Sequence, residues 1–193
     1  TTLEEMHDRG WYELDVVLIT GDAYIDSPFM GISVVGRILE DMGLRVGIIG
    51  QPDVNSDIDV KRMGEPKLFW GVSGGSIDSM VSNYTATKRF RSTDDYTPGG
   101  KNDKRPDRAT LVYTNLIRRY FKGTVPIVLG GIEASLRRLT HYDYWSDKLR
   151  KPILFDTKAD YMVYGMGEQA IIDLGNTLKA GGDPRTIRGL CYI

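Results

Sequence analysis

Residues that build metal and redox sites are scarce in this sequence of 193 residues. Its one cysteine, Cys191, can form neither a disulfide framework nor an iron-sulphur or Cys-rich zinc site. The two histidines, His7 and His141, have no His or Cys partner at ligand spacing. The sequence therefore predicts no metal site within this chain.

Long apolar runs are also missing. No run approaches the ~20 residues that a membrane span requires. The first residues carry acids where a signal peptide would have a basic region followed by an apolar one. We therefore expect a cytoplasmic protein without a membrane partner. The content of 41% hydrophobic and 26% charged residues excludes a disordered or fibrous protein, and the length fits one domain.

Charge is balanced overall, with 25 basic and 26 acidic residues, but it is unevenly distributed. Residues 83–108 hold seven bases and four acids, and residues 137–151 hold five bases and two acids. Such stretches either grip the phosphates of a nucleotide or nucleic acid or form a solvated polar face. The composition alone leaves both alternatives open.

Apolar runs that end at turn residues alternate with segments of helical spacing. Strands are predicted at residues 16–20, 45–49, 67–73, 125–129 and 159–164, with a sixth near 187–193. Helices are predicted near residues 32–42, 77–82, 109–120, 132–139 and 170–178. This alternation predicts an α/β fold, a doubly wound and mostly parallel sheet of five or six strands. We expect a single domain over residues 1–193, with irregular insertions at about 83–108 and 140–158.

Ligands of doubly wound sheets bind beyond the carboxyl ends of the strands, so the loops there are the candidate site. These loops are predicted at residues 21–31, 73–76, 130–135 and 165–168. Gly130 and Gly131 either let the backbone approach a ligand closely or only form a tight turn. Residues 165–170 match the dinucleotide fingerprint loosely, but Glu168 stands where a pyrophosphate should lie. Asp22 and Asp26 flank Tyr24 without defining an acid–base pair.

The segment HYDYWSD at residues 141–147 concentrates aromatic side chains in the second insertion. Such a cluster either stacks on a planar ligand or another domain, or packs on its own domain. No GxSxG, Walker A or paired Ser/His/Asp pattern is present, so the common hydrolase and P-loop classes have no support.

Four longer segments together resemble a known family. They are VVLITGDAYIDSPFMG, YTATKRFRSTDDYTPGGKNDKRPDRA, PIVLGGIEASLRRLTHYDYWSD and KADYMVYGMGEQAI. They closely resemble the N-terminal part of the YgiQ family of radical-SAM iron-sulphur proteins, over nearly the whole chain. The resemblance implies a flavodoxin-like, cobalamin-binding-like domain at the N-terminus of a longer protein.

The resemblance also implies cofactors for the parent protein. The family's three-cysteine CxxxCxxC motif is absent, so a 4Fe-4S cluster and S-adenosylmethionine would be held by a downstream radical-SAM domain in the same parent chain. Cobalamin-binding domains often carry DxHxxG in the first strand-end loop. Here that motif aligns with residues 26–31, where Asp26 and Gly31 match and Pro28 replaces the His. The resemblance therefore implies cobalamin binding, if any, without a protein axial ligand.

Our leading hypothesis is an accessory domain that acts as a lid or substrate platform for a radical-SAM oxidoreductase of unknown substrate, with no catalysis by this chain alone. The predicted cofactor-binding residues are Asp22, Asp26, Gly31, Gly130, Gly131, Gly165, Gly167 and Glu168. The predicted rim or substrate residues are Arg105, Arg108, Arg137, His141, Tyr142 and Trp145. The alternatives are an anion, nucleotide or nucleic-acid binding module that uses the basic insertions, and a structural domain with a vestigial cleft.

Overall fold

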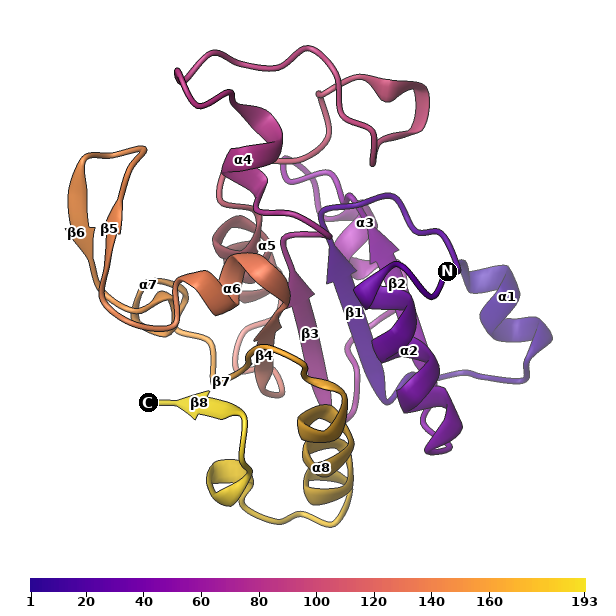
Figure 1. The fold of residues 1–193 in the computed structure, drawn as a ribbon. Coiled ribbons are helices and arrows are strands. Elements are labelled where there is room, and N and C mark those ends of the chain that lie inside the picture. The colour runs from indigo at the N-terminus through magenta and orange to yellow at the C-terminus, as the bar shows by residue number, and fades with distance from the viewer.

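The computed structural model describes all of residues 1–193, which form a six-stranded sheet with helices on both faces (Figure 1). The strands of this sheet are β1 (Val16–Thr20), β2 (Val46–Gly50), β3 (Phe69–Ser73), β4 (Ile127–Gly130), β7 (Tyr161–Val163) and β8 (Leu190–Tyr192). The α-helices are α1 (Leu3–Asp8), α2 (Gly31–Asp41), α3 (Ile58–Lys61), α4 (Ser79–Asn83), α5 (Ala109–Tyr120), α6 (Gly131–Leu136), α7 (Ile153–Thr157) and α8 (Glu168–Lys179). Two short 3-10 helices, η1 (Pro98–Gly100) and η2 (Pro184–Thr186), complete the helical elements.

The sheet has the order β2-β1-β3-β4-β7-β8. The first five strands are parallel, and β8 pairs antiparallel with β7. The predicted doubly wound, mostly parallel α/β fold is confirmed, with each of the five parallel strands found within two residues of its predicted start. The strand order reverses between β1 and β3, which is the point where such folds bind ligands.

The strands are buried because they supply apolar side chains to both faces of the sheet. In β1, Val17 and Ile19 point into one hydrophobic cluster, whereas Val16 and Leu18 point into the other. A buried aliphatic side chain contributes about 1.5–3 kcal/mol, so a strand of this composition is stable only between two helical layers.

Helices α2 and α8 cover one face of the sheet, and α3 and α5 cover the other (Figure 1). Helix α8 approaches α2 closely at Gly175, where a Cβ would lie 3.0 Å from the Met42 Cε atom. The two helices therefore meet towards their C-terminal ends, and their first turns are left to line the space described below.

The two predicted insertions are more structured than their sequences indicate. The first contains η1 and two isolated β-bridges, Tyr84–Phe90 and Thr93–Lys101. The second contains a hairpin of β5 (His141–Asp143) and β6 (Lys148–Arg150), followed by α7. The sequence prediction missed this hairpin and the helices α1, α3 and α7, which have three to six residues each, a length at which periodicity is a weak signal.

No helix in the chain combines the length and the apolar composition needed to cross a membrane.

Candidate functional site

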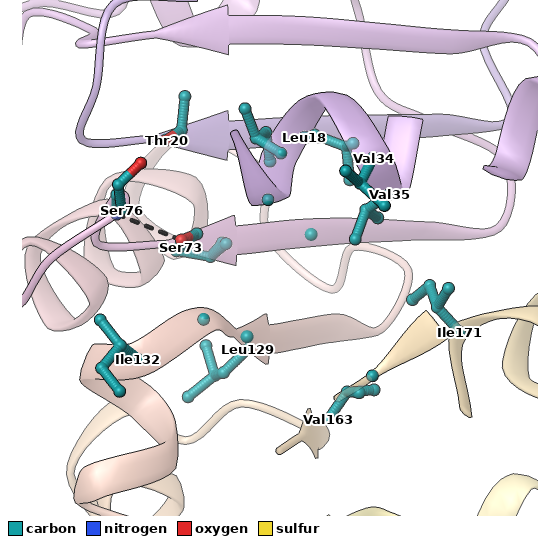
Figure 2. A pocket seen from close by; sticks show the side chains of 18 of the residues that line it. Leu18, Thr20, Val34, Val35, Ser73, Ser76, Leu129, Ile132, Val163 and Ile171 are labelled. Atoms are coloured by element: carbon teal, nitrogen blue, oxygen red, sulfur yellow. Dashed lines mark hydrogen bonds between the residues drawn. The ribbon is translucent and has the colours of Figure 1, made fainter. Parts of the chain in front are cut away.

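A cavity of about 410 Å³ opens at the carboxyl ends of the parallel strands. It lies between the sheet and the first turns of α2, α6 and α8 (Figure 2). Its walls are mainly aliphatic, with Leu18, Val35 and Ile171 among them, and Thr20, Ser73 and Ser76 add hydroxyl groups. An apolar cavity with a few polar groups at the strand ends is typical of a small-molecule site.

The structure brings most of the predicted cofactor-binding residues to this cavity. Its lining includes Asp22, Gly31, Gly130, Gly131, Gly165, Gly167 and Glu168. Asp26 does not line it, because its carboxylate points outward and pairs with the Arg37 guanidinium. The hydrogen bond from Arg37 lowers the pKa of that carboxyl group below its ordinary value.

Two glycines at the cavity mouth are required by their backbone conformation. Gly131 has a φ of +75°, and a Cβ there would lie 2.7 Å from the Ser73 Oγ atom. Gly75 has a φ of +112°, and its Cβ would lie 2.2 Å from the Asp22 Oδ1 atom. Gly130 differs from both, because its backbone is extended and a Cβ would meet nothing within 4 Å. The adjacent residues Gly130 and Gly131 therefore differ in role: Gly131 forms a tight turn, and Gly130 faces open space.

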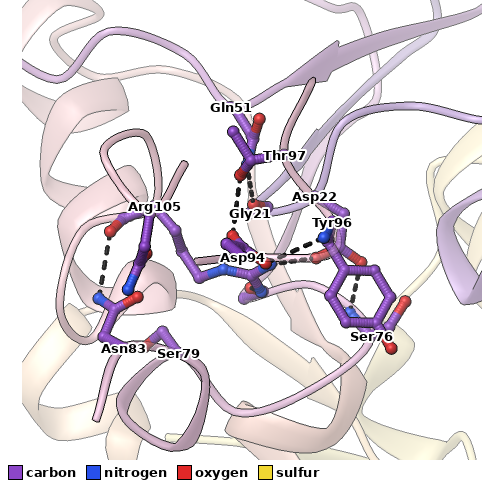
Figure 3. Close-up of polar contacts among 12 residues, drawn as sticks. Gly21, Asp22, Gln51, Ser76, Ser79, Asn83, Asp94, Tyr96, Thr97 and Arg105 are labelled. Carbon is purple, nitrogen blue, oxygen red and sulfur yellow. Dashed lines mark hydrogen bonds and ion pairs between the residues drawn. The ribbon is translucent and has the colours of Figure 1, made fainter. Parts of the chain in front are cut away.

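Asp22 is the buried charged group of the cavity lining, and it is only 1% exposed. Its Oδ2 atom accepts a hydrogen bond from the Ser76 amide at 2.6 Å. The Nη2 atom of Arg105 lies 2.8 Å from its Oδ1 atom, which forms a buried ion pair (Figure 3). Arg105 also donates to the Gly74 carbonyl oxygen at 3.1 Å. The first insertion is thereby tied to the ends of β1 and β3.

The same guanidinium serves a second buried carboxylate, Asp94, whose Oδ2 atom lies 3.2 Å from Arg105 Nη2. Asp94 in turn accepts a hydrogen bond from Thr97, and the Gln51 amide donates to the Thr97 hydroxyl at 2.6 Å (Figure 3). Gln51 also donates to the Gly21 carbonyl oxygen. This network fixes the first insertion over the carboxyl edge of the sheet.

None of the six predicted rim residues lines the cavity. Arg105 is internal, at 5% exposure, instead of standing on a rim. Arg108 pairs with Asp143 of the second insertion at 2.7 Å. Arg137 pairs with Asp78, which precedes α4. His141, Tyr142 and Trp145 belong to the β5–β6 hairpin segment.

Burial opposes the charged form of Asp143, but hydrogen bonds from Arg108 and Ser146 outweigh it and hold the pKa of the carboxyl group well below its usual range. Two of the basic residues of the insertions, Arg105 and Arg108, are therefore engaged by carboxylates of the same chain.

Sequence reasoning missed the apolar lips of the cavity. Phe29 and Ile132 belong to its lining and are 92% and 44% exposed, and Met166, between two lining glycines, is 89% exposed. Large apolar side chains rarely stand this far into solvent around a cavity unless something covers them. The signal that could have found Phe29 and Met166 is a large apolar residue within two positions of a glycine in two strand-end loops, PFMG and GMG.

Glu133 was also missed, and it organises the elements next to the cavity. Its buried carboxylate accepts hydrogen bonds from the Ser79 amide at 2.8 Å and the Thr110 amide at 2.9 Å. These amides belong to the first residue of α4 and the second residue of α5. Their partial positive charge stabilises a carboxylate that has no cationic partner.

The donor groups present decide which cofactors the chain can hold. No cluster of three or more His, Cys, Asp or Glu side chains is arranged to hold a metal ion. Pro28 lines the cavity and offers no ligand nitrogen, and neither histidine is part of the lining. The chain therefore fits an organic ligand or the organic part of a cofactor, and its single thiol does not fit an iron-sulphur cluster.

The strand order and its reversal between β1 and β3 define a doubly wound α/β domain, with the cavity beside the reversal point. The family described as Radical SAM N-terminal matches residues 1–193, so the chain belongs to this family. This confirms the assignment that the resemblance to the N-terminal part of the YgiQ family predicts.

Curated relatives support this assignment. A UPF0313 protein from Fusobacterium nucleatum is 60% identical over 194 residues, which cover 100% of this chain and 34% of the relative. A UPF0313 protein from Thermotoga neapolitana is 56% identical, and the match covers 100% of this chain and 34% of the relative. A UPF0313 protein from Methanocella arvoryzae is 53% identical, and the match covers 99% of this chain and 32% of the relative. The chain thus spans about a third of the length of these relatives.

Solved structures show the same fold. The radical S-adenosylmethionine methyltransferase TsrM from Kitasatospora setae, solved with cobalamin and a [4Fe-4S] cluster bound, is similar with a TM-score of 0.58 and 19% identity. The match covers 93% of this chain and 29% of the TsrM chain. A TsrM structure with tryptophan and a SAM analogue gives a TM-score of 0.57 over 92% of this chain and 28% of that chain, also at 19% identity.

Proposed function

We propose that this chain is the ligand-holding accessory domain of a longer radical-SAM protein. The observation that carries the proposal is the cavity of about 410 Å³ at the strand-order reversal, with apolar walls and an open mouth. The rest of the parent protein supplies the radical-SAM domain, which holds the 4Fe-4S cluster and S-adenosylmethionine. The domain itself performs no catalysis and presents its ligand to that partner domain.

The geometry favours a ligand of two parts. A slender, mainly apolar part fits between the sheet and the first turns of α2 and α8, and the hydroxyls of Ser73 and Ser76 lie at the strand ends for its polar atoms. A broader part rests against the exposed Phe29 and Met166 side chains. Such a ligand and the partner domain would together cover the Phe29 and Met166 side chains. This would account for the exposure of these side chains in the chain alone.

Cobalamin is the cofactor that best matches this description. The cavity lining, with the hydroxyls of Ser73 and Ser76, and the exposed Phe29 and Met166 would hold it. Bound cobalamin supplies cobalt-centred methyl-transfer or radical chemistry. Pro28 would line its site without offering a ligand nitrogen to the metal.

The experiment is a thermal and spectroscopic titration of the purified full-length protein with hydroxocobalamin, S-adenosylmethionine and ATP. A ligand at about 100 times its dissociation constant stabilises the folded state by about 2.7 kcal/mol. For a domain of this size we expect a rise of about 5–10 °C in Tm with cobalamin. The visible spectrum should be the same in the His7→Ala and His141→Ala variants.

A graded pair of variants at Gly130 locates the binding event. The backbone at Gly130 is extended and its surroundings are open, so Gly130→Ala and Gly130→Leu are both expected to fold. Leucine fills the cavity mouth, so it should abolish the Tm shift, whereas alanine should leave it nearly unchanged. Equal shifts in both variants would place the ligand elsewhere. Absence of any shift with all three ligands in the wild type would favour a vestigial cleft.

A further inference from the structure

Four aromatic rings form a continuous row where the two insertions meet. They are Phe90, Tyr84, Trp145 and Tyr144, and successive ring centroids are 5.7, 5.5 and 5.4 Å apart. The hydroxyl of Tyr144 donates to the Ala86 carbonyl oxygen at 2.7 Å, which joins the hairpin of the second insertion to the turn of the first. The end rings, Phe90 and Tyr144, are 58% and 48% exposed.

Cations stand beside this row without carboxylate partners. None of the ion pairs formed by the two insertions includes Lys88, Arg89 or Arg91. The Lys88 ammonium lies 4.6 Å from the centroid of the Tyr144 ring. Lys88 holds this position with a φ of +61°, a conformation that is unfavourable for a residue with a side chain.

The acids near the row are already engaged by neutral groups. Asp107 accepts hydrogen bonds from the Tyr84 hydroxyl and the Asn83 amide, both at 2.8 Å. Asp147 accepts one from the Tyr142 hydroxyl at 2.6 Å. Both carboxylates keep their charge, so the surface around the aromatic row sets the three cations Lys88, Arg89 and Arg91 against two acids, beside rings that are partly exposed.

We infer that this surface, the insertion face, binds single-stranded nucleic acid. Stacked bases match exposed aromatic rings, and the phosphates between them match lysine and arginine side chains that have no carboxylate partner, although Lys88 and Arg91 also donate to backbone carbonyl oxygens. A duplex would present only its backbone, because its bases are already stacked on one another. If an apolar face of another domain covered this surface instead, Lys88, Arg89 and Arg91 would be left without partners. Charge complementarity therefore favours a polyanion as the occupant.

The inference is independent of the cavity ligand. None of the four aromatic residues and none of the three cations lines the cavity. It also differs from a role for the predicted basic residues Arg105 and Arg108, because both are bound to carboxylates inside the chain.

The test is fluorescence anisotropy of the full-length protein with a labelled oligouridylate of about 12 nucleotides, which matches the usual site sizes of such surfaces. A duplex of the same length is the comparison. The Phe90→Leu and Tyr144→Leu variants keep apolar bulk and remove the ring. Each should weaken binding of the single strand by at least about fivefold, because stacking of one base contributes that much affinity.

Charge variants test the phosphate contacts separately. We expect Lys88→Gln combined with Arg89→Gln to reduce the slope of log K against log salt by about 1.4, since each phosphate contact on a single strand contributes about 0.7. The matched control is Lys122→Gln with Lys179→Gln. These two cations are exposed at the C-terminal ends of α5 and α8, outside the insertion face, and should leave the slope unchanged.

Three results would overturn the inference. They are no binding of the single strand at about 50 mM salt, affinity for the duplex equal to that for the single strand, and unchanged affinity in both ring variants. Circular dichroism of each variant shows whether it is folded. Because the ring is removed at two separate positions, misfolding of one variant does not prevent the test.

Discussion

The buried guanidinium of Arg105 gives the most demanding test of the structure. It forms ion pairs with two carboxylates at once, Asp22 and Asp94, which are 1% and 4% exposed. In Arg105→Met the side chain keeps its apolar bulk, but two negative charges are left in the interior. Removing one partner of a buried ion pair costs about 3–5 kcal/mol, which is a large share of the ~5–15 kcal/mol by which domains are stable.

The assay is urea denaturation followed by circular dichroism at pH 7. We expect the free energy of unfolding to fall by at least about 3 kcal/mol, and Tm to fall by about 10 °C. The control is Arg185→Met, which breaks the exposed pair between Arg185 and Asp183 and should leave stability nearly unchanged. A loss below about 1 kcal/mol in Arg105→Met would refute the buried network.

Removing the two acidic charges provides an independent check. Without Arg105, Asp22 and Asp94 are two buried carboxylates with no cation between them. Adding Asp22→Asn and Asp94→Asn should restore much of the loss at pH 7, because the remaining groups are neutral.

Two further predictions concern single residues near the site. The folded pKa of Asp143 is lowered by Arg108 and Ser146 despite burial, so its contribution is present above the unfolded pKa of ~3.9 and is lost as pH falls through the folded value. Asp143→Asn should therefore cost about 2 kcal/mol at pH 7, and urea denaturation should show that difference shrinking below about pH 4; a constant difference would contradict the assignment. Gly75→Ala should cost about 3 kcal/mol or more in the same assay, because its Cβ would meet Asp22 Oδ1 at 2.2 Å at a φ of +112°. Gly130→Ala, in open space with an extended backbone, is its control, and equal effects of the two alanines would count against the tight turn at Gly75.

The parallel strands could be predicted from sequence because each is a short apolar run buried on both faces. In β1 all five residues are buried, and no alternation with polar residues blurs the pattern. The antiparallel direction of β8 could not be predicted in this way. Residues 187–193 have a strand-like composition, but direction depends on η2 returning the chain beside β7, which leaves no local signal.

The loops of the cavity were predictable from topology, because the carboxyl ends of parallel strands meet at one edge. The position of Arg105 was not. In the sequence it lies among seven bases and reads like part of a solvated loop. Its two carboxylate partners lie 83 and 11 residues away, and only the folded chain shows that both face the same guanidinium.

The basic residues of the first insertion include both buried and exposed side chains. The Arg105 side chain points inward and holds the segment over the cavity edge, whereas Lys88, Arg89 and Arg91 stay outside, without carboxylate partners, beside aromatic rings. A solvated polar face would not need the buried anchor, and a purely structural anchor would not need exposed rings and cations. With the binding proposed for the insertion face, the segment would have two separable roles. Loss of Arg105 should destabilise the edge of the cavity, whereas loss of Phe90 or Lys88 should change binding and leave stability intact.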